Sequence, residues 1–397
     1  MSVNERIVNP ISTEELQRRW SAVRKAMDEQ SIDVLVMQNS NEFLGGYVKW
    51  FTDNPARNAY PHAVMFPKDG LMTVVQQGPF GMEKTVAVDD FANRGVGKVL
   101  TNPSYSSINY SKHYDAELIA GEIKKLGSKT VGLVGAAGMY YPFCNYLQNG
   151  SIPGATFVDA TELVDEIKAI KSNEEIQYIK QTAAMQDKVI AEVAKSIQPG
   201  MKDFEVAALA QYVGQLNGSE QGIFLGTSAP VGQASHFAQR HNQGRVLKEG
   251  DHLSLLVENN GPGGFYTEIA RTFVLGKASQ DLVDGLEDVK EAQQNTLKNL
   301  APGVACKEIF KAHNDFMRAR KLPPESRLYS HGQGYDMVER PLIRDDEYMT
   351  IKENMNIVIH PAYSTSSKFA VICDNYLITD TGVSECLHKT PQEIIEL

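Results

Sequence analysis

At 397 residues the chain is longer than a single hydrophobic core usually supports, so two domains are expected. Its 42% hydrophobic and 22% charged residues are typical of a globular protein and exclude a disordered or fibrous one. The net charge of -10 leaves no basic surplus to neutralise phosphates, which argues against nucleic acid or an anionic membrane as a partner.

Neither the N-terminus nor the cysteines indicate an extracellular or membrane protein. The first ten residues contain no apolar run, so neither a signal peptide nor an anchor is expected, and no stretch approaches the length of a transmembrane helix. The four cysteines form no CxxC pair and no tight cluster, which fits a reducing cytoplasm and disfavours structural zinc held by cysteines alone. A cytoplasmic location is therefore predicted.

The N-terminal part alternates helical and strand patterns. Charged and apolar residues at helical spacing predict a helix over residues 14–30, and a buried strand follows at 33–37. Strands at 63–66 and 72–75 flank Lys68-Asp69-Gly70, a hairpin signal, and further strands are predicted at 130–134 and 155–158. Residues 1–165 are thus predicted to form an α/β domain.

A second domain, residues 166–397, opens with helices. The stretch 162–195 reads as helical, and Ser172 with Glu175 supplies the two residues of a capping box. Apolar side chains then recur on one face, and the helix is predicted to stop at Gln198-Pro199-Gly200.

The second domain contains a weak internal repeat. The segment 196–200 recurs at 299–303, and the segment 247–251, which leads into a strand, recurs at 351–355, about 103 positions later in each case. Each copy of the first segment follows one helix and opens another. The spacing predicts a duplicated α+β half folded around one sheet.

Four segments carry a resemblance to a known family: residues 249–276, 331–341, 352–363 and 371–382. They resemble the pita-bread family of creatinase, aminopeptidase P, prolidase and methionine aminopeptidase, and the entry helix from 170 onward is similar as well. The resemblance implies a creatinase-type α/β N-terminal domain followed by an α+β pita-bread catalytic domain with an internal pseudo-twofold duplication. It also implies a homodimer in which the N-terminal domain reaches the partner's active site.

The resemblance places the metal-ligand positions of the family on altered residues. Metal-dependent members bridge two ions with two aspartates, one histidine and two glutamates, because paired carboxylates can share both cations. Here Glu268 stands at the second aspartate and His331 at the histidine, while His360 and Cys373 stand at the two glutamates. The first aspartate falls on Val257 or Leu256, with Glu258 as the nearest carboxylate. A dinuclear site is therefore not expected.

The leading hypothesis is a creatinase-like hydrolase that cleaves a non-peptide C–N bond of a small amino-acid-like or zwitterionic molecule, with no cofactor. His241 or His331 moves the protons, because histidine titrates near neutrality, with His236 as a second choice in the same loop. Glu258 and Glu268 hold a cationic nitrogen. The remaining catalytic and substrate-binding candidates are His360, Arg340, Tyr266, Arg57, Tyr60 and Trp50.

Two alternatives stay open. Glu268, His331 and His360 form a two-histidine, one-carboxylate set that suits one zinc or divalent iron ion, for hydrolysis or for a lyase reaction. A non-catalytic pita-bread binding protein is the third reading. Ordinary structural roles also compete: an ion pair for Arg340, and core packing for the aromatic residues of 47–60.

Overall fold

The computed structural model describes residues 9–41, 46–57, 59–111 and 113–397. The chain forms two compact units, Met1–Lys168 and Ala169–Leu397. The predicted domain boundary after residue 165 falls inside helix α5 (Thr161–Lys168). The terminal stretch 1–8, where the sequence predicts neither signal peptide nor anchor, lies outside the described residues. No helix in the described ranges is long and apolar enough to cross a membrane.

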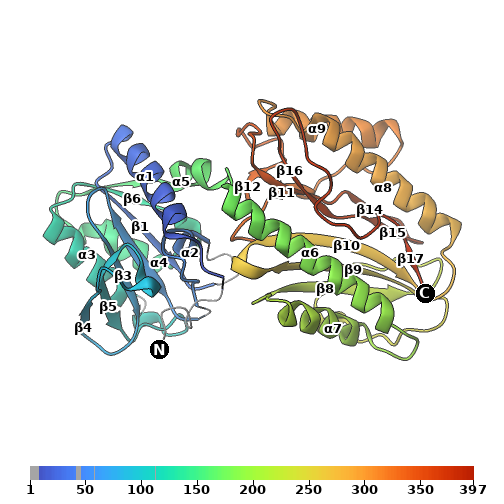
Figure 1. Cartoon of the computed structure of the whole chain (residues 1–397), viewed down its shortest axis with the longest axis horizontal. Coiled ribbons are helices and arrows are strands. Elements are labelled where there is room, and N and C mark those ends of the chain that lie inside the picture. The colour runs from blue at the N-terminus through green and yellow to red at the C-terminus, as the bar shows by residue number, and fades with distance from the viewer. Residues whose placement is uncertain (1–8, 42–45, 58, 112) are drawn as a thin grey trace. The chain divides into compact units, whose positions relative to one another are not determined.

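Unit 1 is built on a mixed sheet with the strand order β4-β5-β3-β2-β1-β6-β7 (Figure 1). The strands are β1 Val34–Asn39, β2 His62–Pro67, β3 Met72–Gln77, β4 Met82–Thr85, β5 Val96–Asn102, β6 Thr130–Leu133 and β7 Thr156–Asp159. Besides α5, the helices are α1 Thr13–Glu29, α2 Gly46–Thr52, α3 Tyr114–Leu126 and α4 Tyr141–Tyr146. The predicted hairpin is confirmed, because β2 and β3 pair antiparallel around Gly70, whose φ of 94° favours glycine.

Unit 2 contains four long helices and two larger sheets among the residues described (Figure 1). The helices are α6 Asn173–Ser196, α7 Asp203–Leu216, α8 Gln280–Asn299 and α9 Cys306–Ala319. One sheet has the order β17-β10-β9-β8, with β8 Gly222–Ala229, β9 His252–Asn260, β10 Tyr266–Val274 and β17 Ile395–Glu396. The other has the order β12-β11-β13-β16, with β11 Ser330–Gly332, β12 Glu339–Leu342, β13 Asn356–Ile359 and β16 Asp374–Leu377. A small hairpin joins β14 Ala362–Ser364 to β15 Phe369–Val371.

The internal duplication predicted from the sequence is confirmed at the level of backbone hydrogen bonds. The amide of Gly200, before α7, donates to the carbonyl oxygen of Leu247 at 2.9 Å, and the amide of Gly303, before α9, donates to that of Ile351 at 2.8 Å. Both glycines have positive φ, 96° and 89°. The predicted capping box at the start of α6 is also present, since Ser172 and Glu175 exchange side-chain hydrogen bonds with each other's backbone.

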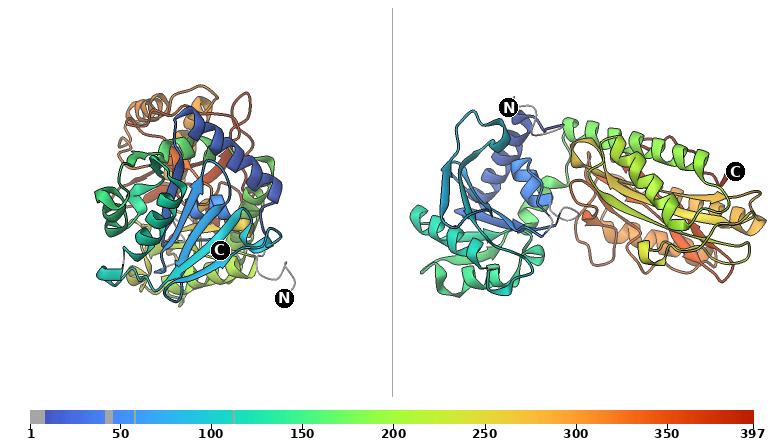
Figure 2. Two further views of the ribbon diagram at one scale, coloured as in Figure 1. Left: turned by 90° about the vertical axis from the view of Figure 1, so that its left-hand side faces the viewer. Right: turned by 90° about the horizontal axis from the view of Figure 1, so that it is seen from below.

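Each half of unit 2 has its own core, and a third cluster lies between the sheets. Helices α6 and α7 pack on β9 and β10, while α8 and α9 pack on β13 and β16, on the opposite side of the strands (Figure 2). The cluster between them, here called the inner cluster, comprises Leu256, Ala270, Val358, Ala362, Phe369, Val371 and Cys373. Side chains on the inner face of either sheet therefore converge on one buried region.

Candidate metal centre

The hairpin of β9 and β10 brings two glutamates together. Glu258 and Glu268 are direct cross-strand partners, so their side chains leave the same face of the sheet. Because strand residues alternate, that face is the one that Leu256 and Ala270 present to the inner cluster. Both carboxylates are buried. Val257 packs instead in the core under α6 and α7, so the register of Glu258, which the sequence left open, places its carboxylate inside.

The second sheet brings two histidines to the same region. His331 on β11 pairs with Val358, a member of the inner cluster, and His360 follows two residues after Val358. The two imidazole rings lie 5.3 Å apart, centre to centre, at 70°. Cys373, where the resemblance placed a glutamate, is buried beside them, and its thiol donates to the main-chain oxygen of Glu268 at 3.4 Å.

Three of these side chains form a set suited to a metal ion. The ligand atoms of Glu268, His331 and His360 all lie within 4.8 Å of one another. The Nδ1 atom of His331 lies 3.0 Å from the carbonyl oxygen of Gly332, so Nδ1 carries the proton and donates it to this oxygen. The lone pair of Nε2 is then available to bind a metal ion. The Nε2 atom of His360 is buried with no hydrogen-bond partner among the described residues. Two neutral imidazoles and a carboxylate are ligands that zinc and divalent iron accept.

The electrostatics of the set favour a cation. Burial raises the pKa of Glu268 to about 7 and lowers the pKa of His331 to about 4. Burial also raises the pKa of Glu258, and the neighbouring Glu268 raises it further. The histidines therefore stay neutral near pH 7, and the positive charge of Arg327 only partly opposes the effect of burial on Glu268. A divalent ion would supply further positive charge.

An amide network, which the sequence reasoning missed, holds the carboxylates in place. The Nε2 atom of Gln333 donates to Glu258 at 2.9 Å, and Asn375 donates to the oxygen of Gln333 at 2.9 Å. Asn375 also accepts the amide of Glu268 at 2.8 Å and donates to Asn356 at 3.1 Å. The sequence feature that could have identified these two amides is their position: Gln333 follows His331 by two residues, and Asn375 follows Cys373 by two.

The two loop histidines have different surroundings. His241 lies on an exposed turn, where its Nε2 atom contacts the Asn242 side chain at 3.2 Å. His236, also exposed, packs its ring 5.3 Å from that of Phe369, a member of the inner cluster. His241 itself lies on the short turn Arg240–Asn242. Its assignment as the proton carrier stays a prediction.

Two of the predicted substrate-binding residues, Arg340 and Trp50, have structural contacts of their own. The Arg340 guanidinium makes a bidentate ion pair with Glu347 at 2.5 and 3.0 Å, which is the ordinary structural role considered for it, and its role in binding a substrate carboxylate stays a prediction. Trp50 is 1% exposed and packs on Phe51 in the core of unit 1, which leaves no surface for a ligand.

Three other predicted residues lie as follows. Tyr266 is buried, and the charge of Glu258 joins burial in raising the pKa of its hydroxyl. Arg57 and Tyr60, in unit 1, are exposed and form an isolated backbone bridge with each other. Their proposed contact with substrate stays a prediction.

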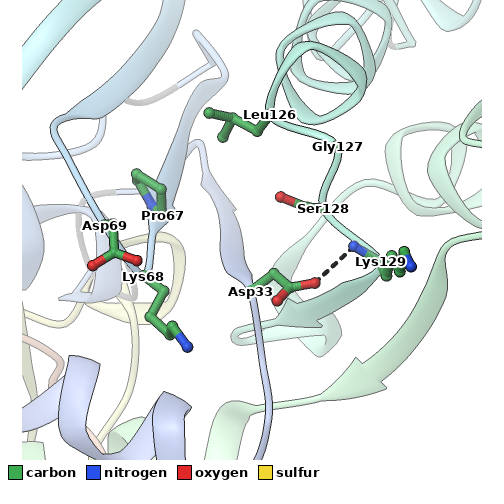
Figure 3. Close-up of a pocket in the computed structure, with 8 residues that line it drawn as sticks. All are labelled: Asp33, Pro67, Lys68, Asp69, Leu126, Gly127, Ser128 and Lys129. Atoms are coloured by element: carbon green, nitrogen blue, oxygen red, sulfur yellow. Dashed lines mark hydrogen bonds between the residues drawn. The ribbon is translucent and has the colours of Figure 1, made fainter.

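Unit 1 contains a separate surface cavity of about 350 Å³ (Figure 3). Its charged lining residues include Asp33, whose carboxylate accepts the amides of Lys129 at 2.7 Å and Thr130 at 2.9 Å. Lys68 on its wall pairs with Asp28 at 2.9 Å. These groups hold a turn and a strand start, and none of the predicted site residues lines the cavity.

Comparison with known proteins shows consistent similarity to metal-dependent peptidases. Residues 177–380, more than half of the chain, match the family model "Metallopeptidase family M24". The chain is 26% identical over 273 residues to the Xaa-Pro dipeptidase of Pyrococcus furiosus, covering 68% of this chain and 76% of that one. It is 24% identical over 398 residues to an uncharacterised hydrolase/peptidase of Sinorhizobium fredii, covering 97% and 98%. The crystal structure of X-Pro aminopeptidase from Thermotoga maritima aligns with a TM-score of 0.77, at 18% identity, over 95% of this chain and 99% of that one.

These findings correct two expectations. The expected cleavage of a non-peptide C–N bond is wrong, because the relatives are named for dipeptidase, aminopeptidase and prolidase activity. The expected absence of a cofactor is wrong as well, because the matching family is one of metallopeptidases and the inner face holds a set of metal-ligating side chains. With its two-domain architecture and pita-bread unit, the chain is a hydrolase that belongs to the M24 metallopeptidase family.

Proposed function

We propose that this protein hydrolyses the peptide bond of short peptides, dipeptides above all, with one divalent metal ion held by Glu268, His331 and His360. The observation that carries the proposal is the convergence of these ligand atoms within 4.8 Å, with the buried Nε2 atom of His360 lacking any partner in the described chain. Support for peptide substrates comes from relatives named Xaa-Pro dipeptidase, at 26% and 28% identity.

The residues around the ion have separate tasks. When bound, a divalent ion supplies Lewis acidity toward the scissile carbonyl and lowers the pKa of water. Glu258 faces Glu268 across the hairpin and lies outside the ligand set, so it is the group that takes the proton of the attacking water and passes it to the leaving nitrogen. Gln333 orients the Glu258 carboxylate through its 2.9 Å hydrogen bond.

The walls of the site favour an uncharged substrate side chain. The partly buried Leu225, Ala234 and Phe237 pack against the inner cluster, and the ring of His236 contacts Phe369. Apolar surface of this kind gains by burying a compact hydrophobic group. Dipeptides of the form Xaa-Pro, which the named relatives cleave, are therefore the first substrates to test.

The decisive experiment compares metal content and dipeptide hydrolysis in full-length variants purified without a metal-affinity tag. We expect about one equivalent of zinc or iron per chain to be lost, together with hydrolysis, in His331→Ala and in His360→Ala. His113→Ala, a histidine replacement in unit 1, is the matched control and keeps both. Hydrolysis that survives complete metal removal would overturn the proposal. Two equivalents per chain that are both lost in these variants would overturn its mononuclear part.

Assembly is a second part of the proposal. We propose a homodimer in which Arg57 and Tyr60, exposed on unit 1, contribute to the partner's substrate site. Arg57→Ala should then raise KM several-fold with metal content unchanged, because an arginine binds a substrate carboxylate but takes no part in the ligand set. Sedimentation analysis gives the oligomeric state, and a monomer that is fully active would contradict the assembly.

A further inference from the structure

Unit 2 contains a second cluster of metal-ligating side chains. The ligand atoms of Asp374, Cys386 and His388 all lie within 4.8 Å of one another. Asp374 and His388 are buried, and Cys386 is half-buried. Cys386 and His388 are separated by one residue near the C-terminus, whereas Asp374 lies on β16. None of these three belongs to the set proposed for catalysis.

The hydrogen bonds of Gln186 determine which nitrogen of His388 carries its proton. The amide nitrogen of Gln186 donates to the carbonyl oxygen of Thr267 at 2.6 Å and to the side-chain oxygen of Asn259 at 2.9 Å, so its Oε1 atom is an acceptor. This Oε1 atom lies 2.8 Å from Nε2 of His388, which must therefore carry hydrogen. The arrangement resembles the second-layer support that fixes metal-binding histidines in proteins.

The other nitrogen of His388 faces a carboxylate oxygen. Its Nδ1 atom is buried without a hydrogen bond in the described structure, and it lies 3.2 Å from the Oδ1 atom of Asp374. Two electron-rich atoms at this distance require either a proton or a cation between them. The separation is close to the edge of a tetrahedron around zinc, about 3.3 Å for bonds of about 2.0–2.1 Å.

Asp374 has a lone pair available for such a cation. Arg271 donates to Oδ1 at 2.8 Å, and Gln392 donates to Oδ2 at 2.8 Å. Each carboxylate oxygen accepts about two bonds, so Oδ1 retains one position, on the side of His388. The positive charge of Arg271 offsets the carboxylate, and a thiolate from Cys386 would offset part of the charge of a divalent ion.

Cys386 connects the cluster to solvent. It lines a cavity of about 460 Å³ together with Lys180, Asp187, Leu377 and neighbouring residues of 384–389. An ion thus has an entry path, and a water in the cavity can complete a fourth coordination position. A thiol among the ligands selects for thiophilic ions over magnesium or calcium.

We propose that Asp374, Cys386 and His388 form a second metal site, of structural type, for a thiophilic divalent ion such as Zn²⁺. Binding forms bonds from the ion to oxygen, sulfur and nitrogen, and releases the thiol proton of Cys386 to solvent. The ion would hold the segment 384–392 against β16. The proposal is independent of the proposed catalytic function, because the two sites share no residue.

Cobalt is the probe that separates this site from the catalytic one. In the full-length Glu268→Ala/His331→Ala/His360→Ala variant, stripped of metal, we expect Co²⁺ titration to saturate near one equivalent with thiolate-to-cobalt charge-transfer absorption in the near ultraviolet. Adding Cys386→Ser should abolish that absorption and weaken Zn²⁺ competition at least about tenfold. Adding Cys144→Ser instead, another half-buried cysteine but in unit 1, should leave both unchanged.

Each outcome decides the proposal. Absence of a thiolate band in the triple variant, or a band that persists after Cys386→Ser, would overturn it and leave His388 as a protonated partner of Asp374. Circular dichroism of each variant verifies folding, and Cys386→Ser is chosen because it preserves side-chain size at a half-buried position. Loss of the band with loss of zinc-dependent thermal protection supports a structural ion.

Discussion

The catalytic proposal depends on which atom of each side chain is left without a partner inside the protein. The Nδ1 atom of His331 donates to the carbonyl oxygen of Gly332, so its Nε2 atom is available to a ligand. One carboxylate oxygen of Glu258 accepts a hydrogen bond from Gln333, which positions the carboxylate without neutralising its charge. A buried polar atom with no partner costs free energy, so such atoms mark places where an ion or a substrate belongs.

The pKa of Glu268 predicts how stability depends on pH in the metal-free protein. Burial raises this pKa from 4.5 to about 7, so the folded protein keeps the proton over a range in which the unfolded chain has lost it. The contribution of Glu268 to the free energy of unfolding is therefore fully present below about pH 4.5. It is lost as the pH rises through about 7, by about 3 kcal/mol in total. Glu268→Gln removes this loss.

Urea unfolding with a chelator present checks the sign. Glu268→Gln should gain stability relative to the parent chain at about pH 8 and show little difference at about pH 4. A gain that is equal at both pH values would indicate a packing effect and contradict the raised pKa. Added metal should reverse the order at the higher pH, because only the ionised carboxylate binds it.

Replacing Glu258 separates proton transfer from metal binding. Glu258→Gln keeps the size of the side chain and its neighbours, so metal content should stay at the level of the parent chain. The rate constant kcat should fall by about 10²–10⁴-fold, the usual contribution of a general base. Loss of the metal in this variant would show that Glu258 is a ligand and would contradict its assignment as a base.

At the scale of elements, the β9–β10 hairpin sets the position of both glutamates, and α6 sets the position of the hairpin. A Cβ atom at Gly261 would lie 2.3 Å from the hydroxyl and 2.8 Å from the Cα atom of Thr182 on α6. The hairpin can reach its site only because this residue has no side chain. A glycine is common in a tight turn for local reasons, but the close approach to a helix 79 positions away depends on tertiary packing.

Gly261→Ala therefore tests whether packing of the hairpin on α6 positions the site. The variant should lose about 1–3 kcal/mol of unfolding free energy, because the backbone of the hairpin must move off α6. Metal affinity should fall with it. Gly244→Ala is the matched control, since a Cβ atom there meets nothing within 4 Å, and its stability should change by less than about 0.5 kcal/mol. Equal losses in the two variants would contradict the packing argument.

At the scale of the whole molecule, the two compact units offer separate spectroscopic signals. Both tryptophans of the chain, Trp20 and Trp50, lie in unit 1, whereas every proposed metal ligand lies in unit 2. Each unit has its own sheet and its own core. Tryptophan fluorescence thus reports the unfolding of unit 1, and far-ultraviolet circular dichroism reports both units.

Saturating metal should shift the two signals differently. At about 100 times Kd an ion stabilises the unit that binds it by about 2.7 kcal/mol. The circular dichroism transition of unit 2 should move to higher temperature, while the tryptophan transition stays in place. Equal shifts in both signals would show that the two units unfold as one. The His331→Ala/His360→Ala/Cys386→Ser variant, which lacks ligands of both proposed metal sites, is the control.

The sequence by itself determined the elements that depend on local pattern. The capping box at Ser172, the hairpin around Gly70 and the repeated glycines Gly200 and Gly303 are properties of a few adjacent residues, and the structure contains each of them. The family resemblance likewise depends on short segments. His331 and His360 were identified in this way, because their neighbours in the chain match the family.

Only the tertiary structure decided which side chains meet. The pairing of Glu258 with Glu268, the amide network through Asn375, and the placement of His236 rather than His241 near the inner cluster all depend on strand register and loop path. A shift of one residue would turn a strand's side chains to the other face. Spacing along the chain cannot determine that choice, because register is set by packing between segments distant in sequence.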